Sequence, residues 1–515
     1  MTKEISLRSN ADETLLSGRS FNISLMIIAG LGGILRVREF LSGRSLWLDE
    51  AMLALNILDR SFLGLTRQPM EYGQSAPIGY VFGVKFFNLL LGSSEYALRL
   101  FSLLVGLASL VLMAWLAKKF LGRIGALIAM AFFSFAPFLI YYSAELKQYM
   151  DDVTAGLFLL FIFVRHIEKN PEESTWRDYL LSGLVGALLL WFSHPALFVA
   201  AGVGAILFVH ALLTKDRRVI ARTMGLLALW GLSIVVLYLV NLRYLTNSDL
   251  LLDYWEDGFM PMPPWSLVGF RWFGHTWRAI LDNPLEFSPD NPGLVFLVFI
   301  IGFVVLAIKN WRVGAALGSV FLFALAASAL EKYSLIGRML LFLTPVIFLF
   351  LAAGIDGIGS LIRNKWLGVA VKLALAGYFM FIPVKYSIER FITPKIQEHI
   401  KPTMEYLQEN YREGDKIYVY YYTEPAFRFY APKFGFERDE YIAGEKHQDD
   451  PEAYLRELDA LAGAKRVWLI FSHVYFKDDF NEQDYMLAYL DEIGEKTREY
   501  RVPRTAVNLY LYDLK

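Results

Sequence analysis

The sequence predicts a polytopic α-helical membrane protein with a small soluble α/β domain at its C-terminal end. Of its 515 residues 56% are hydrophobic, and the mean hydropathy is +0.39, which is high for a soluble protein. Apolar runs recur along the first three quarters of the chain, and each is long enough to cross a hydrocarbon layer of about 30 Å. The first run begins near Phe21, after a polar stretch, and no cleavage site of small residues follows it. It is therefore predicted to be a membrane helix rather than a signal peptide.

About eleven membrane spans are predicted from these runs. They cover residues 21–40, 95–117, 124–143, 151–165, 178–195, 197–213, 221–240, 292–308, 313–330, 338–354 and 367–384. Alternate connections are basic, and together with Lys3, Arg8 and Arg19 they all fall on one side of the membrane. Short basic loops are typical of the cytoplasmic side. The loop 41–94, the turn 141–152, the loop 241–291, the turn 331–338 and the C-terminal tail are then external.

The tail is predicted to be a separate domain, residues 385–515, that follows a transmembrane domain of residues 1–384. It carries 19 basic and 25 acidic residues, whereas the remainder of the chain has an excess of basic residues. Strands are predicted at 416–422, 466–471 and 507–512, and helices at 396–411, 451–462 and 482–493. This alternation is typical of an α/β layer domain. The tail has no glycine-rich phosphate loop and no metal-ligand cluster, so no chemistry is predicted there. The chain has no cysteine, which excludes disulfides and thiolate metal sites.

Two external loops have patterns of their own. In the first, Leu48, Met52, Leu55 and Phe62 recur at helical spacing, which predicts an amphipathic helix in the membrane interface, and a second such helix is predicted at 78–91. Loop 241–291 is rich in proline and aromatic residues, including Tyr254, Trp255, Trp265, Trp272 and Trp277. A loop of this length is either functional or anchored in the interface by its aromatic residues.

Asp49 and Glu50 are adjacent carboxylates at the start of the first external helix. Charged side chains at a membrane surface cost free energy, so a charged pair there indicates a functional or structural role. One carboxylate of the pair is a candidate general base, because a neighbouring like charge raises the pKa of one of them. The alternative is structural: Asp49 caps the following helix and Glu50 complements its dipole.

The turn at 141–152 contains Glu145 and Lys147 between Tyr142 and Tyr149. Lys147 is a candidate phosphate ligand, and Glu145 would position the phosphate or a metal. The alternative is a salt-bridged helix end in which Lys147 pairs with Asp151 four residues on.

Three further residues are predicted at the same membrane level. Arg99 begins one span and Arg338 precedes another, and arginine binds phosphate in a bidentate manner. The alternative for each is an arginine that snorkels to the interface. His194 ends a span on the same face and is either a supporting site residue or a hydrogen-bonded structural histidine.

Taken in order, these segments resemble the GT-C superfamily of membrane glycosyltransferases, and in particular its bacterial protein-mannosyltransferase-like and aminoarabinose-transferase-like branch. The similar segments are residues 45–51 with the Asp-Glu pair, the proline-containing residues 74–80, the helix start at 97–102, the Tyr-Ser-x-Glu-x-Lys-x-Tyr pattern at 142–149, and the Gly-Arg-x-Leu-Leu-Phe-x-x-Pro pattern at 337–345.

The resemblance implies inverting transfer of a hexose or pentose from a polyprenyl phosphate to a protein, lipid or glycan acceptor. It places the active site and the tail on the periplasmic face of a bacterial inner membrane. Asp49 would be the base, with Glu50 as second candidate, and Lys147, Arg99 and Arg338 would face the donor phosphate.

In the same resemblance Tyr142, Glu145, Tyr149 and His194 would support the site. No cofactor is assigned, but a divalent metal is an open possibility, with Asp49, Glu50 and Glu145 as candidate ligands. Membrane lipids are expected partners, and nucleic acid is not.

Three other functions remain open: a polymerase or ligase of lipid-linked glycans, a flippase, and an assembly scaffold without catalysis. A flippase would carry charged groups through midplane spans and an internal repeat, whereas here the charges gather at one face. A scaffold would tolerate replacement of Asp49 and Glu50.

Overall fold

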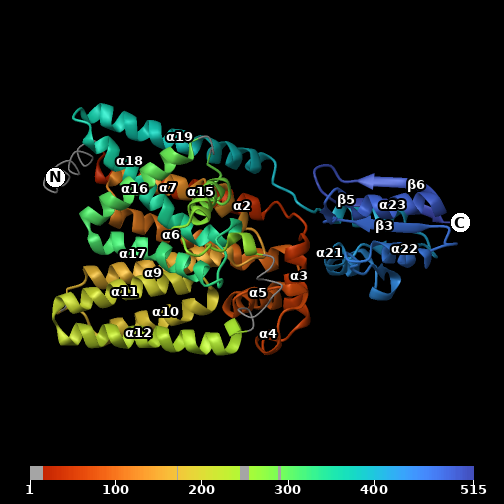
Figure 1. The fold of residues 1–515 in the computed structure, drawn as a ribbon, viewed down its shortest axis with the longest axis horizontal. Helices are drawn as coiled ribbons and strands as arrows, with labels where there is room; N and C mark the ends of the chain where they lie inside the picture. The colour runs from red at the N-terminus through yellow and green to blue at the C-terminus, as the bar shows by residue number, and fades with distance from the viewer. Residues whose placement is uncertain (1–15, 171, 244–254, 288–290, 515) are drawn as a thin grey trace.

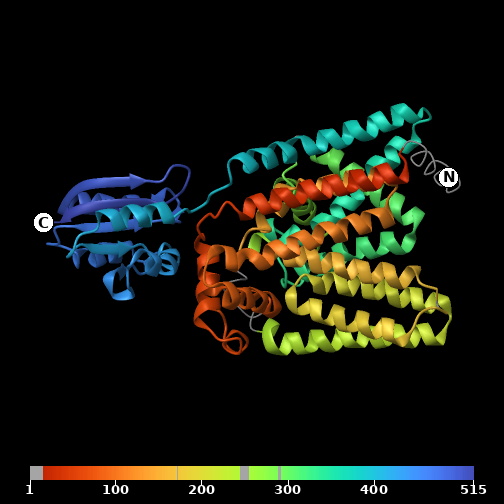
Figure 2. The same ribbon diagram turned by 180° about the vertical axis from the view of Figure 1, so that it is seen from behind.

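The computed structural model describes residues 16–170, 172–243, 255–287 and 291–514. It consists of a long bundle of helices and a small α/β domain at one end of that bundle (Figure 1; Figure 2 shows it from behind). The predicted fold class is confirmed. Lys3, Arg8 and Tyr254, which entered the sequence analysis, lie outside the described residues.

The bundle corresponds to the predicted spans. Among the described residues, eight helices are long and apolar enough to cross a membrane: α2 (Gly18–Phe40), α6 (Glu95–Phe120), α11 (Ala196–Thr214), α12 with its π-helical end η2 (Arg217–Leu242), α16 (Pro292–Lys309), α17 (Trp311–Ala329), η4 with α18 (Gly337–Leu361) and α19 (Lys365–Ile392). The other three predicted spans are α7 (Arg123–Ser134) with α8 (Pro137–Tyr142), α9 (Tyr149–Glu168) and α10 (Trp176–Phe192). The break between α7 and α8 precedes Pro137, which lacks the N–H that a continuous helix needs.

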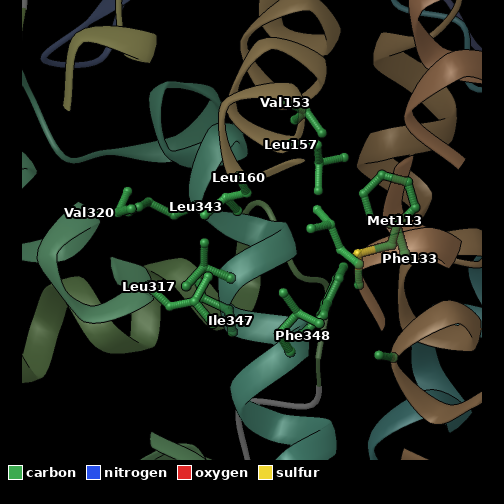
Figure 3. Packing of buried hydrophobic residues seen from close by; sticks show 14 of the residues in the cluster. Met113, Phe133, Val153, Leu157, Leu160, Leu317, Val320, Leu343, Ile347 and Phe348 are labelled. Atoms are coloured by element: carbon green, nitrogen blue, oxygen red, sulfur yellow. The ribbon is translucent and has the colours of Figure 1, made fainter. Parts of the chain in front are cut away.

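Helix α18 is the centre of the bundle. It is buried along almost its whole length, and it packs against α7, α16 and α19. Figure 3 shows Leu343, Ile347 and Phe348 of this segment facing Leu317 and Val320 of α17 on one side and Phe133 of α7 on the other. This apolar packing holds the segment from which Arg338 projects, together with the Tyr333 hydroxyl, which donates to the Met339 carbonyl (2.8 Å).

The two ends of the bundle differ in charge. The basic connections lie at the end where α2 begins, and ion pairs link neighbouring helices there, such as Lys119 Nζ to Glu168 Oε2 at 2.6 Å and Lys169 Nζ to Asp178 Oδ2 at 2.6 Å. The first loop and the α/β domain lie at the opposite end (Figure 1). The predicted grouping of segments on two sides therefore agrees with the structure, and which side faces the cytoplasm stays a prediction.

The first loop folds into α3 (Leu48–Asp59), α4 (Gly64–Arg67), η1 (Glu71–Gly73) and α5 (Ile78–Leu91). Both predicted helices are present, but α3 is covered by protein instead of lying with one face in the interface. Its residues Leu53, Ala54 and Ile57 are buried in one cluster with Val81 of α5 and Phe427 of the α/β domain. The apolar periodicity of α3 therefore reflects its burial against α5 and the α/β domain, not contact with lipid.

The α/β domain has a five-stranded sheet of order β2-β1-β3-β7-β6, in which β1 is parallel to β2 and β3, and β7 is antiparallel to β3 and β6. The strands are β1 (Lys416–Val419), β2 (Ile442–Ala443), β3 (Val467–Phe471), β6 (Gly494–Arg501) and β7 (Asn508–Leu514), and a separate hairpin is formed by β4 (Phe476–Lys477) and β5 (Phe480–Asn481). The helices are α20 (Lys401–Asn410), α21 (Glu424–Tyr430), α22 (Pro451–Asp459) and α23 (Glu482–Ile493), with short 3-10 turns η5 (Ala431–Phe434) and η6 (Arg438–Glu440). The three predicted strands and three predicted helices are confirmed, whereas α21, β2, β6 and the β4–β5 hairpin were not predicted. Helix α19 continues to Ile392, past the predicted domain boundary at 384.

Side chains of this domain hold the backbone just before Asp49. The Ser45 N–H donates to His399 Nδ1 (3.2 Å), the Leu46 N–H to the Tyr430 hydroxyl (2.9 Å) and the Leu48 N–H to Glu398 Oε2 (2.9 Å). His473, whose ring lies 6.4 Å from the Trp47 ring, donates from Nδ1 to Glu398 Oε1 (2.7 Å). The start of α3 is thereby fixed by the tail rather than by a local cap.

Candidate active site

Asp49 lies at the second position of α3 and does not cap it. The N-cap residue is Trp47, which makes no side-chain capping bond, so the capping alternative for Asp49 is wrong. Its carboxylate faces two cations instead: Oδ2 is 2.7 Å from Arg338 Nη1, and Oδ1 is 3.4 Å from Lys147 Nζ. Asp49 therefore joins segments that lie about a hundred and almost three hundred residues further along the chain.

Electrostatics keep Asp49 ionised. Burial raises the pKa of its carboxyl, but the charges of Lys147 and Arg338 and the hydrogen bond from Gln74 outweigh burial and hold the pKa well below its usual range. About a fifth of the side chain (19%) is exposed, so it can be reached from outside. Asp49 is a charged, accessible carboxylate between two cations.

Gln74, which no sequence pattern marks as a site residue, connects Asp49 to Lys147. Its Nε2 donates to Asp49 Oδ1 (3.2 Å), and its Oε1 accepts from Lys147 Nζ (2.7 Å). The alternative pairing of Lys147 with Asp151 is wrong, because residues 143–148 form a turn rather than a helix. Burial lowers the pKa of Lys147, an effect that the Asp49 charge opposes.

Arg338 is surrounded by aromatic rings. Its guanidinium carbon lies 5.9 Å from the Trp47 ring centroid, 5.6 Å from that of Tyr149 and 5.8 Å from that of Trp255. Tyr142 packs edge-on against Tyr149 with centroids 4.9 Å apart. Such rings hold a guanidinium in place without neutralising it. Trp255 shows that loop 241–291 reaches the site, whereas Trp265 is exposed, as expected for an anchor.

Glu50 points away from Asp49 and is fully buried. Arg99 donates from Nε to Glu50 Oε1 (2.8 Å) and from Nη2 to Oε2, and the Leu146 N–H donates to Oε1 (2.7 Å). Two more of the five Arg99 N–H donors reach the carbonyls of Arg44 (2.7 Å) and Ser45 (3.1 Å). The structure thus speaks against two assignments: Glu50 has no open side to act as a base, and Arg99 is buried with four of its five N–H donors already bound to protein groups.

Glu145 lies between this buried pair and the Asp49 cluster. Its Oε1 accepts from Trp47 Nε1 (3.2 Å), and its Oε2 is 3.8 Å from Arg44 Nη2. Burial and the Glu50 charge raise the pKa of the Glu145 carboxyl to about 7. Glu145 therefore holds the Trp47 ring over Arg338.

This raised pKa predicts a pH-dependent stability. The folded protein holds a proton on Glu145 up to about pH 7, while the unfolded chain loses it near the ordinary value of 4.5, so the stabilising contribution of Glu145 is lost as the pH rises from 4.5 to about 7. We expect Glu145→Gln to remove this loss. Thermal unfolding of both proteins across that range measures it, with Glu168→Gln at the other end of the bundle as control. A parallel pH dependence in wild type and Glu145→Gln would contradict the prediction.

His194 lies outside the Asp49 cluster. His194 Nε2 pairs with Asn241 Oδ1 (3.1 Å) at the predicted external ends of α10 and α12, which is the structural alternative.

Within the described ranges no group of three or more His, Cys, Asp or Glu side chains is arranged to hold a metal ion. Asp49 faces Lys147 and Arg338, and Glu50 faces Arg99, so these carboxylates do not fit a divalent cation.

Three comparisons bear on the fold. Residues 75–242 match the model of the dolichyl-phosphate-mannose-protein mannosyltransferase family. The apo structure of ArnT from Cupriavidus metallidurans is similar with a TM-score of 0.51 at 12% identity, covering 92% of this chain and 96% of ArnT. No curated protein matches the sequence.

The oligosaccharyltransferase of Archaeoglobus fulgidus is also similar. Its structure tethered to an acceptor peptide has a TM-score of 0.52 at 11% identity and covers 88% of this chain and 69% of the other. Its complex with an inhibitory peptide and a dolichol-phosphate has a TM-score of 0.50 at 12% identity, with coverage of 95% and 74%. The chain thus has the fold of ArnT and of the archaeal oligosaccharyltransferase, and residues 75–242 resemble the protein mannosyltransferase family.

Proposed function

We propose that this chain transfers a sugar from a polyprenyl-phosphate donor to an acceptor at the end of the bundle that carries α3. The observation that supports this most is the position of Asp49 between Lys147 and Arg338. A base next to two phosphate-binding cations is what displacement of a phosphate from an anomeric carbon requires. The GT-C fold and the match over residues 75–242 support the same function.

In the proposed step, the acceptor hydroxyl or amine attacks the anomeric carbon from the side opposite the phosphate. A bond forms between the acceptor atom and that carbon, the carbon–oxygen bond to the phosphate breaks, and its electron pair leaves with the polyprenyl phosphate. Asp49 takes the acceptor proton. Lys147 and Arg338 stabilise the charge that builds on the phosphate, and the anomeric configuration inverts.

Donor binding would also activate Asp49. With the cations paired to it, Asp49 is too weak a base, because its pKa is held low. A donor phosphate competes for Lys147 and Arg338, and each cation that turns to the phosphate lets the Asp49 pKa rise toward its ordinary value. The base would thus become effective only when the donor is present.

The charge distribution supports an external site, and we place the reaction on the periplasmic face of a bacterial inner membrane. The basic connections lie at the far end of the bundle, and the site and the tail share the other end (Figure 2). Hexoses and pentoses are both compatible donors, and a protein, a lipid or a glycan is a compatible acceptor.

The donor half of the proposal is tested by binding of a synthetic polyprenyl phosphate to the purified full chain. Lys147→Gln and Arg338→Gln should each weaken binding by about tenfold or more, because each removes a charge-assisted hydrogen bond to the phosphate. Native mass spectrometry or quenching of tryptophan fluorescence measures the affinity. Arg428→Gln, which removes an exposed arginine paired with Asp59, should bind as wild type. Wild-type affinity in both site variants would refute the assignment.

A further inference from the structure

A second cationic site lies outside the Asp49 cluster. A cavity of about 520 Å³ is bounded by the end of α2 and by residues 393–400, which link α19 to α20. Its polar lining consists of Arg38, Ser42, Arg44 and His399, and its apolar lining of Leu41, Pro394 and Ile396. We call it the α2–linker cavity.

Two polar atoms of its lining are left without partners. Ser42 Oγ and Arg44 Nε are buried and make no hydrogen bond to any described residue. The Arg44 side chain is only 4% exposed. Its Nη1 and Nη2 donate to Glu39 and to the Ala144 carbonyl, so only Nε is left without a partner. A buried guanidinium N–H and a buried hydroxyl without partners cost free energy unless a ligand satisfies them.

His399 adds a third donor to the cavity. Its Nδ1 accepts the Ser45 N–H (3.2 Å), so in the neutral ring the proton is on Nε2, which can donate. Burial and the Lys401 charge lower the pKa of His399, which favours this neutral form. The donors of Ser42, Arg44 and His399 all suit the oxygens of an anion.

The surroundings of the cavity are positively charged. Arg38 lies over the Phe391 ring at 5.9 Å, and Lys395 lies over the Tyr141 ring at 5.8 Å, the same ring that Arg44 covers at 4.2 Å. Burial and the nearby Arg390 charge lower the pKa of Lys395. Glu39 pairs with Arg44, which leaves Arg38 and Lys395 to attract an anion.

Apolar residues exposed on the same side indicate that the anion belongs to a lipid. Leu41 is 60% exposed and lines the cavity, and Ile388 (55%) and Ile392 (72%) are exposed in the last turns of α19, where the linker begins. Apolar side chains next to a cationic cavity at the end of two membrane-spanning helices suit an acyl or prenyl chain below a charged headgroup.

We propose that the α2–linker cavity binds the phosphate headgroup of a membrane lipid. This site is separate from the one assigned to the donor phosphate: Arg44 meets Glu145 from one side, while Trp47, on the other side of Glu145, covers Arg338. The protein would therefore hold two phosphate-bearing lipids at the same time, one on each side of Glu145.

The test is binding of dioctanoyl phosphatidic acid to the purified full chain, followed by native mass spectrometry. The measurements use a Lys147→Gln/Arg338→Gln background, which removes both cations of the donor site. We expect one bound phosphatidic acid, weakened about tenfold by Arg38→Gln because a charged donor is lost. Arg363→Gln removes an exposed arginine at the opposite end of the bundle and should have no effect. Filling the cavity with Ser42→Leu should also abolish binding while the thermal unfolding midpoint stays near that of the background protein.

Two further probes identify the source of the phosphate. Dioctanoyl phosphatidylcholine, whose phosphate is shielded by choline, should bind at least about tenfold more weakly, and inorganic phosphate should compete only at much higher concentration. Equal binding of the two lipids, equal effects of Arg38→Gln and Arg363→Gln, or displacement by inorganic phosphate at equal concentration would each overturn the proposal. Failure of this test leaves the Lys147 and Arg338 assignment untouched, because that assignment is measured by comparing wild type with the Lys147→Gln and Arg338→Gln single variants, in which the α2–linker cavity is unchanged.

Discussion

Asp49→Asn should slow sugar transfer by about a thousandfold, because the amide cannot take the acceptor proton. The same replacement should not weaken donor binding. It keeps the shape of the side chain and a hydrogen-bond partner for Gln74, and it removes the anion that competes for Lys147 and Arg338. A polyprenyl phosphate should therefore bind Asp49→Asn as tightly as wild type or more tightly. If Asp49 were purely structural, its replacement would lower the transfer rate and the donor affinity together.

The rate can be followed in native membranes as release of polyprenyl phosphate from a panel of synthetic polyprenyl-phosphate hexoses and pentoses. Asp59→Asn is the matched control, since Asp59 is a half-exposed carboxylate on the same helix that pairs with Arg428. It should transfer at the wild-type rate. Wild-type transfer by Asp49→Asn would refute the base, and loss of transfer together with loss of donor binding would show that Asp49 only shapes the site.

The sequence predicted the fold class and the group of residues at the site, but not which carboxylate of the pair faces outward. Adjacent residues on a helix point about 100° apart, so Asp49 and Glu50 must face different surroundings. The cations that distinguish them, Lys147, Arg338 and Arg99, come from three other helix ends. No local pattern in the first loop contains that information.

The role of the tail was missed for a related reason. The apolar spacing of α3 shows that the helix is buried but not what covers it, and a membrane interface and a protein surface give the same pattern. The contacts of Glu398, His399 and Tyr430 with the backbone at 45–48 join residues about 350 or more positions apart. Gln74 was missed because a single glutamine carries no signal until Asp49 and Lys147 are placed around it.

Arg99→Met should be the most destabilising of the single replacements around the site, by about 3–5 kcal/mol, because it leaves the Glu50 charge buried without its partner. Arg99→Met combined with Glu50→Leu should recover much of that loss, since an apolar pair of similar volume carries no charge into the interior. The recovery should be incomplete, because Glu50 also accepts the Leu146 N–H and Arg99 also donates to two carbonyls.

Thermal unfolding of the wild type, both single variants and the double variant gives a double-mutant cycle. The difference between the free-energy change of the double variant and the sum of the two single changes is the interaction energy of Arg99 with Glu50. Polyprenyl phosphate binding by the double variant, measured below its unfolding midpoint, then separates the two roles considered for Arg99. If Arg99 only supports the turn that carries Lys147, the folded double variant binds the donor within a few fold of wild type. If Arg99→Met were as stable as wild type but lost donor binding, Arg99 would contact the phosphate, and the ion pair with Glu50 would be the resting partner that the donor displaces.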